Sequence, residues 1–125
     1  MSDHSRNETL EDVSQAFDLL RNARRRGVLY MLNRNGRMSV QAVARRITEW
    51  QSEADGSAPD VETVETSLVH SHLPKLDAAG VVEYDPDEET VELDESARDL
   101  DPLLQCTRER EPGFHSFGNR QPSNV

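Results

Sequence analysis

Hydrophobic residues recur at helical spacing in the first third of the chain. Residues 10–20 carry one such stripe, spaced at i, i+3, i+7 and i+10, which consists of Leu10, Val13, Phe17 and Leu20. Asn22 is suited to break this helix and to cap a second one, in which Val28, Leu29 and Leu32 form the apolar stripe. Asn35-Gly36 then ends the second helix.

Two further helices are predicted after Gly36. Ser39 is a suitable N-cap for a helix from Val40 to about Gln51. Residues 52–59 have the composition of a loop, and Asp60 can cap a fourth helix that Gly80 ends.

Apolar and polar residues alternate in the next segment. The sequences "VVEYD" at residues 81–85 and "TVELD" at residues 90–94 flank "PDEE", which predicts a short antiparallel hairpin. Three or four helices followed by a two-stranded hairpin is the element order of a winged helix-turn-helix. The predicted fold class is therefore α+β and mainly helical.

The same pattern predicts the limits of the domain. Residues 9–95 form the predicted winged helix-turn-helix domain, and residues 1–8 are expected to be a disordered N-terminus. A weak apolar pattern predicts a short C-terminal helix at residues 96–106, and residues 107–125 lack periodicity and are expected to be a disordered tail. A chain of 125 residues accommodates one such domain.

Charge is distributed unevenly along this acidic chain. The formal net charge is -10, and Lys75 is the single lysine among 14 basic residues. Between Leu19 and Thr48 there is no carboxylate but there are eight arginines, namely Arg21, Arg24, Arg25, Arg26, Arg34, Arg37, Arg45 and Arg46. Such a separation creates a local positive field on a negative molecule, so an anionic partner is expected.

Several segments resemble winged-helix regulators. "SLVHSHLPKLDAAGVVEYD", residues 67–85, resembles the recognition-helix-to-wing segment of the arsenic-repressor-like (ArsR) class, through Ser67, His72-Leu73, Leu76 and Ala79-Gly80-Val81-Val82. "ARRRGVLYML" and "MSVQAVARRI" resemble its second and third helices. With the acidic composition, "LLRNARRRGVLYML" and "HLPKLDAAGVVEYDPD" look like a haloarchaeal winged-helix family. The resemblance covers about residues 10–95 and implies a DNA-binding transcriptional regulator of a haloarchaeon.

Three features depart from that pattern. Pro74 falls inside the fourth helix, where proline removes a hydrogen bond, so we expect the helix to kink or restart near Leu73. The wing tip at residues 85–89 is acidic and cannot favourably approach phosphates. The predicted loop at residues 52–59 is longer than a tight helix-turn-helix turn.

A helical projection selects the residues that we expect to contact double-stranded DNA. On the second and third helices, the candidates for phosphate contact are Arg24, Arg26, Gln41, Arg45 and Arg46. On the fourth helix, the uncharged residues opposite the inward face are Thr63, Thr66, Ser67 and His70, which could face the major groove. Arg25 lies on the core side of its helix, where its guanidinium is expected to pair with a carboxylate. A homodimer fits this interpretation, because one such helix reads few base pairs.

The sequence leaves a second function open. The arginine patch of a winged helix could instead dock an acidic protein partner without binding DNA. The acidic wing favours this alternative, as does the absence of Arg and Asn from the outward face of the fourth helix.

Other function classes have weaker support. His70 and His72 with Cys106 could suggest a metal or redox sensor, but "HSH" places its imidazoles about 200° apart on a helix, whereas zinc sites favour i, i+4 spacing. We therefore predict no metal. The sequence lacks a nucleophile motif and a glycine-rich phosphate loop, so we predict no enzyme, no cofactor and no small-molecule ligand. The chain has no apolar run that could span a bilayer and no apolar signal region, which predicts no membrane association and a cytoplasmic location.

Overall fold

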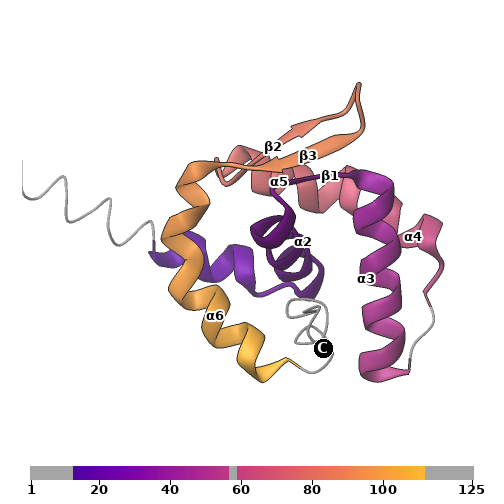
Figure 1. The fold of residues 1–125 in the computed structure, drawn as a ribbon, viewed down its shortest axis with the longest axis horizontal. Helices are drawn as coiled ribbons and strands as arrows, with labels where there is room; N and C mark the ends of the chain where they lie inside the picture. Colours follow the sequence, from indigo (N-terminus) through magenta and orange to yellow (C-terminus); the bar gives the residue numbers. More distant parts are fainter. Residues whose placement is uncertain (1–12, 57–58, 112–125) are drawn as a thin grey trace, which may run out of the picture.

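The fold is seen in a computed structural model that describes residues 13–56 and 59–111 (Figure 1). It is mainly helical with a small antiparallel sheet, as predicted for a winged-helix-like α+β fold. A helix at residues 13–20 comes first. The elements that follow are α2 (Ala23–Asn35), β1 (Arg37–Ser39), α3 (Val40–Asp55), α4 (Val61–Ser67), the π-helical turn η1 (Leu68–His72), α5 (Leu73–Ala78), β2 (Val82–Asp85), β3 (Thr90–Leu93), the 3-10 helix η2 (Glu95–Leu100) and α6 (Asp101–Arg110). None of the helices in the described ranges is long and apolar enough to cross a membrane.

Helix α2 is the centre of the molecule. It lies between α6 on one side and α3 with α4 on the other (Figure 1). Its buried residues are Arg25, Gly27, Val28, Leu29, Tyr30, Met31 and Leu32. A helix that packs against neighbours on several sides buries more than one stripe, so burial extends beyond the predicted stripe.

The predicted helix boundaries around α2 and at the start of α3 are confirmed. The Asn22 side chain accepts hydrogen bonds from the backbone N–H groups of Arg24 and Arg25. Gly36 ends α2 with a φ of 80°, a conformation that glycine adopts at little cost. Ser39 caps α3, because its Oγ accepts a 3.1 Å hydrogen bond from the Ala42 N–H.

Helix α3 is longer than predicted. Residues 52–55, which we expected in a loop, continue the helix until Gly56 caps it in the left-handed conformation. The four residues Ser52 to Asp55 contain neither glycine nor proline, so nothing in them ends a helix that is already formed.

The helix that contains Pro74 restarts where expected. After α4 the chain makes the π-helical turn η1, and α5 begins at Leu73 with Pro74 in its first turn. The π turn changes the hydrogen-bond register just before the proline. The backbone stays helical through His72 and Leu73, and the Leu73 N–H bonds the Leu68 carbonyl, so the helix accommodates the missing N–H of Pro74 at this change of register.

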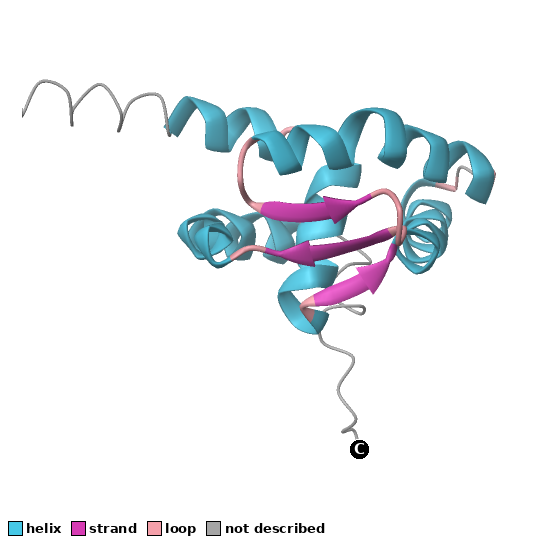
Figure 2. Cartoon of the chain, turned by 90° about the horizontal axis from the view of Figure 1, so that it is seen from above, coloured by secondary structure: helices cyan, strands magenta, loops and turns pink. Residues whose placement is uncertain are grey.

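The predicted hairpin is present, but the sheet has three strands rather than two (Figure 2). The strand order is β1-β3-β2, and Met38 of β1 is paired with Val91 of β3. Strand β1 has only three residues, too few to show an alternating pattern in the sequence.

The wing tip is an ordered turn that also contacts α3. The Asp85 carboxylate accepts hydrogen bonds from the backbone N–H groups of Asp87 and Glu88, and Glu89 adopts a φ of 57°. The Glu89 carbonyl then accepts a 2.9 Å hydrogen bond from the Val40 N–H. The acidic wing is thereby tied to the start of α3.

The two ends of the described chain correct the sequence-based prediction. Val13 and Phe17 of the predicted stripe are 49% and 60% exposed, whereas Leu20 of the same stripe is buried together with Leu19, so only the C-terminal end of the predicted stripe packs against the core. At the other end, residues 107–110 belong to α6 and not to a disordered tail. The predictions for Leu10, for residues 1–12 and for residues 112–125 lie outside the described residues.

Candidate nucleic-acid interface

The run Arg24-Arg25-Arg26 opens α2, and each arginine contacts a different part of the fold. Positive charge at a helix N-terminus is disfavoured by the helix dipole. The sequence makes Arg24 and Arg26 candidates for phosphate contact, which would offset this cost. Both side chains instead have partners inside the molecule.

Arg24 connects α2 to two neighbouring helices. Its Nε donates a 3.0 Å hydrogen bond to Oε1 of Gln51 on α3, and its Nη1 donates a 2.8 Å bond to Oγ of Ser67 on α4. The Ser67 hydroxyl in turn donates to the Val64 carbonyl. Arg24 and Ser67, both predicted DNA contacts, are therefore bonded to each other in a partly buried setting.

Arg25 is 8% exposed, which confirms its predicted burial. Its partners are carbonyls and not the carboxylate that we expected. Nε donates to the Leu19 carbonyl at 2.9 Å and Nη2 to the Asp18 carbonyl at 2.8 Å. Those carbonyls lie at the C-terminus of the first helix, where backbone acceptors have no intrahelical donor. Arg25 thus caps the preceding helix, and burial lowers the pKa of its guanidinium.

Arg26 attaches the C-terminal helix to α2. Its Nη2 lies 2.8 Å from Oε2 of Glu111 and its Nε donates to Oε1 of the same carboxylate, while Nη1 donates to the Leu20 carbonyl. The Tyr30 hydroxyl donates a 2.7 Å bond to Glu111 and lies 2.6 Å from the Thr107 hydroxyl. The hydrogen bonds to Glu111 raise the pKa of Arg26.

His72 packs against the same arginines. Its Nδ1 lies 3.4 Å from Nη1 of Arg25. Burial first, and then the positive charges of Arg25 and Arg24, lower the pKa of His72 to about 4. His72 is therefore a neutral, partly buried residue at the α2–η1 contact.

The remaining predicted contacts lie at the surface of α3 and of the α4–η1 helix. Gln41 and Arg45 are exposed on α3, and Arg46 is partly buried. Thr63, Thr66 and His70 are exposed on α4 and η1. Within the described part of the chain, Arg45 has no hydrogen bond or ion pair.

Acidic side chains also line the outer face of α4. Glu62 and Glu65 border a shallow hollow of about 280 Å³ together with Thr66, Val69 and His70. Glu65 is partly buried but reaches this surface, so the outward stripe is not free of acids as the helical projection indicated.

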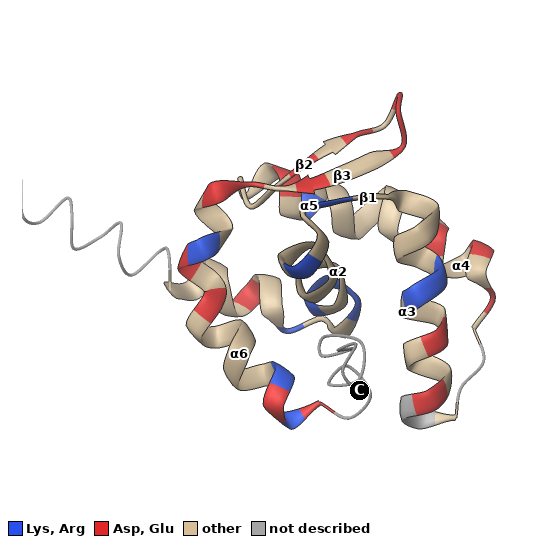
Figure 3. Ribbon diagram, in the orientation of Figure 1, with Lys and Arg blue, Asp and Glu red and all other residues tan. Residues whose placement is uncertain are grey.

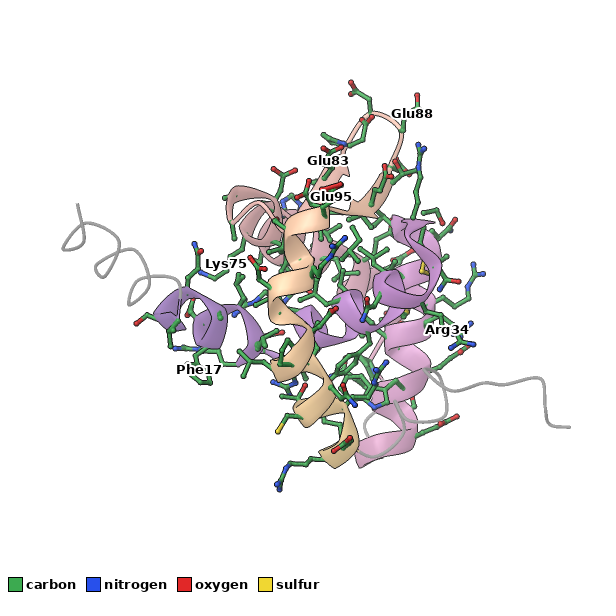
Figure 4. The ribbon with its side chains drawn as sticks, turned by 60° about the vertical axis from the view of Figure 1, so that its left-hand side comes forward. Phe17, Arg34, Lys75, Glu83, Glu88 and Glu95 are labelled. Atoms are coloured by element: carbon green, nitrogen blue, oxygen red, sulfur yellow. The ribbon has the colours of Figure 1, made fainter. Side chains whose placement is uncertain are left out.

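The wing adds further negative charge. Figure 3 shows that Asp and Glu residues occur along the hairpin and at its tip, and Figure 4 shows Glu88 projecting from the tip. On the outer face of the sheet, Glu83 is paired directly with Glu92 and both are exposed, with Arg37 on the other side of Glu92. The wing therefore presents a mostly acidic surface next to the α3–α4 pair.

No metal centre is visible at this surface. Among residues 13–56 and 59–111, no group of three or more His, Cys, Asp or Glu side chains could hold a metal ion. His70 is exposed while His72 packs on Arg25, so the two imidazoles of "HSH" do not face a common site.

Residues 17–92, which include all of the helices and strands from α2 to β2, match the family described as Domain of unknown function (DUF7344). The chain belongs to the DUF7344 family. No curated protein and no solved structure matches it. The matched range of the DUF7344 domain contains the run Arg24–Arg26, the helices α3 and α4 and most of the wing, but not α6.

Proposed function

We propose that this DUF7344 protein is a winged-helix transcriptional regulator that binds double-stranded DNA through α3 and α4. The observation that carries the proposal is the exposed Arg45 on α3, which packs against α4 and η1, where Thr63, Thr66 and His70 are exposed. Arg45 and the partly buried Arg46 would contact phosphates, with Gln41 at the first turn of α3. The hydroxyls and the imidazole would hydrogen bond to base edges in the major groove.

The proposed contact set is smaller than the one predicted from sequence. Arg24, Arg26 and Ser67 are bonded within the fold, so they would position α2 and α4 rather than reach DNA. The resemblance of residues 67–85 to arsenic-repressor-like regulators supports the choice of the continuous helix α4–η1–α5 as the recognition helix.

The acidic surface dictates the conditions for binding. At a net charge of -10, long-range forces repel DNA at low ionic strength. In molar salt the Debye length is about 3 Å, so the carboxylates of the wing no longer repel a distant phosphate. Short-range contacts from α3 and α4 would then supply the affinity.

The test is retention of mixed genomic DNA fragments by the full chain at 0.1 M and at about 2 M salt, values chosen to span the screening range. We expect retention of specific fragments, loss of retention with Arg45→Glu, and normal retention with the matched variant Arg98→Glu, which changes the same charge at an exposed position of η2. Failure to retain any fragment in either salt would reject DNA binding. So would equal losses in the two variants.

A second function is favoured by Glu62, Glu65 and the acidic wing, which surround the proposed DNA surface. In this alternative, Arg45 on α3 docks an acidic protein partner and no DNA is bound. Co-purification of one such partner with the wild-type chain, its loss with Arg45→Glu and no DNA retention in either salt would establish it.

A further inference from the structure

An apolar groove of about 650 Å³ lies between the first helix (residues 13–20) and α6. Phe17 borders it from the first helix, and Leu103 and Cys106 line it from α6. The Phe17 side chain is 60% exposed and projects away from the body of the molecule (Figure 4). Large apolar side chains that are exposed beside an apolar hollow mark a contact surface.

The end of α6 directs the following chain toward this groove. Thr107 lines the groove, and Glu111 follows it by about one helical turn. The Glu111 carboxylate is bonded to Arg26, so the chain leaves α6 from a fixed point. Glu111 has a φ of -97° and a ψ of 119°, the extended conformation that a residue before a proline prefers. Pro112-Gly113 is a turn sequence, and a turn here would send the chain back along α6.

The segment after Glu111 contains the apolar side chains that could fill the groove. Two of the three phenylalanines of the chain are Phe114 and Phe117. After a turn at Pro112-Gly113, Phe114 would lie beside the last turn of α6. Phe117 follows three residues later, an extended reach of about 10 Å, whereas Cys106 lies about 7.5 Å back from Glu111 along the helix axis. Both rings can therefore reach the groove without any change in α6.

This segment suits the groove better than the other candidate occupants. Residues 1–12 adjoin the first helix but contain four carboxylates, which lose their hydration in an apolar groove, whereas residues 112–125 contain no aspartate or glutamate. A second chain would have to approach against a net charge of -10 on each copy. A segment tethered at the edge of the groove has instead an effective concentration on the order of millimolar.

We propose that residues 112–125 fold back along α6 and cover the groove, with the rings of Phe114 and Phe117 packed between Phe17 and Cys106. The bound segment would remove the exposed ring of Phe17 and the apolar wall of α6 from water. Helix α2 separates the groove from the α3–α4 surface (Figure 1), so this packing does not depend on DNA binding.

The reactivity of Cys106 tests the proposal in the full chain. Cys106 is the single cysteine and is exposed on α6 in the described residues, so its reaction with a maleimide reports whether the groove is covered. Phe114→Ser/Phe117→Ser should raise the rate by about tenfold or more, because burial of even one phenylalanine ring favours the bound segment by about this factor. Gln121→Ser/Asn124→Ser makes two replacements in the same segment without removing a ring and should leave the reaction slow. The rate in the wild type should not change with protein concentration, since the segment and the groove belong to one chain.

Three results would overturn the proposal. One is an equal rate in the wild type and in Phe114→Ser/Phe117→Ser. Another is an equal increase in Phe114→Ser/Phe117→Ser and in Gln121→Ser/Asn124→Ser, which would show that the rings do not hold the segment. The third is protection of Cys106 that appears only as the concentration rises, together with the mass of two chains by sedimentation equilibrium, because a second copy would then cover the groove.

Discussion

The arginines at the start of α2 and Arg45 on α3 carry the same guanidinium group, but the first are bonded within the fold and the second is exposed to solvent. The run Arg24–Arg26 opens α2, and all three guanidinium groups are bonded to other parts of the fold. Arg45 lies in the middle of α3 and is exposed, without a partner in the described residues. The sequence predicts that the arginine-rich segment as a whole faces an anionic partner. In the structure, the start of α2 and the exposed face of α3 are instead two regions in different environments.

The difference follows from the helices that carry them. Helix α2 is surrounded by the first helix, α3, α4 and α6, so side chains at its start point toward backbone carbonyls and neighbouring helices. Helix α3 is amphipathic, with Val43, Ala44 and Ile47 buried and its opposite face in solvent. Charge density in the sequence therefore does not identify a binding surface unless the exposure of each helix face is known.

Of the substitutions that test this difference, Arg26→Ala should have the largest effect on the free energy of unfolding. Arg26→Ala removes the cation of a partly buried ion pair and leaves the Glu111 carboxylate without its partner. Side chains that are 18% and 16% exposed are only partly screened, so we expect a loss of about 2–3 kcal/mol in the free energy of unfolding. Urea denaturation followed by circular dichroism measures it.

Glu111 provides the control for that measurement. Arg26→Met combined with Glu111→Leu removes both charges and should recover part of the lost stability, because no buried charge then lacks a partner. Equal stability of Arg26→Ala and the wild type would contradict the role of Arg26 in attaching α6.

Arg24 should have a smaller effect. Arg24→Ala loses two partly buried hydrogen bonds, to Gln51 and Ser67, and should lower the free energy of unfolding by about 1–2 kcal/mol. A double-mutant cycle with Ser67→Ala should give a coupling energy of about 1 kcal/mol. The opposite result would be a coupling energy near zero, together with unchanged stability and weaker DNA retention in Arg24→Ala. It would indicate that Arg24 contacts DNA.

The pH dependence of the free energy of unfolding tests the contact between His72 and the arginines of α2. Its pKa is about 4 in the folded chain and about 6.5 when unfolded. Between these values the unfolded chain binds a proton that the folded chain does not, so stability decreases as the pH falls from about 6.5 to 4. Because the imidazole is partly solvated, we expect about 1–2 kcal/mol over this window. His72→Gln should flatten the profile there, while His70→Gln, at an exposed position, should leave it unchanged.

Much of the fold was predictable from local signals. Asn22, Gly36 and Ser39 determine helix boundaries through their own backbone and side-chain geometry, so their positions in the sequence are enough. Pro74 likewise predicts the restart at Leu73 from its missing N–H alone. The exposed candidates Gln41, Arg45, Thr63, Thr66 and His70 follow from helical periodicity, because their helices pack on one main side.

The rest depends on contacts between distant residues. Arg26 and Glu111 are 85 residues apart, and Arg24 and Ser67 are 43 apart, so no local pattern pairs them. One signal was available for Arg25 and Arg26: they lie three and four residues after Asn22, the predicted end of a helix, where arginine can bond the last carbonyls. The exposure of Phe17 could not be predicted either, because helical spacing shows which residues share a face but not which face is covered.

Arg45→Ala should have the smallest effect on stability. It also tests most directly whether Arg45, unlike the arginines of α2, serves an external partner. Arg45→Ala removes an exposed side chain, so the free energy of unfolding should change by less than about 0.5 kcal/mol. If Arg45 contacts a phosphate, the same substitution should weaken retention of all DNA fragments alike and reduce the slope of log affinity against log salt by about 0.9. Fluorescence anisotropy with a retained fragment over a salt series measures that slope, and Arg98→Ala at an exposed position of η2 is the matched control. An unchanged slope would remove Arg45 from the interface. A stability loss comparable to that of Arg24→Ala would instead place Arg45 in the internal framework with the arginines of α2.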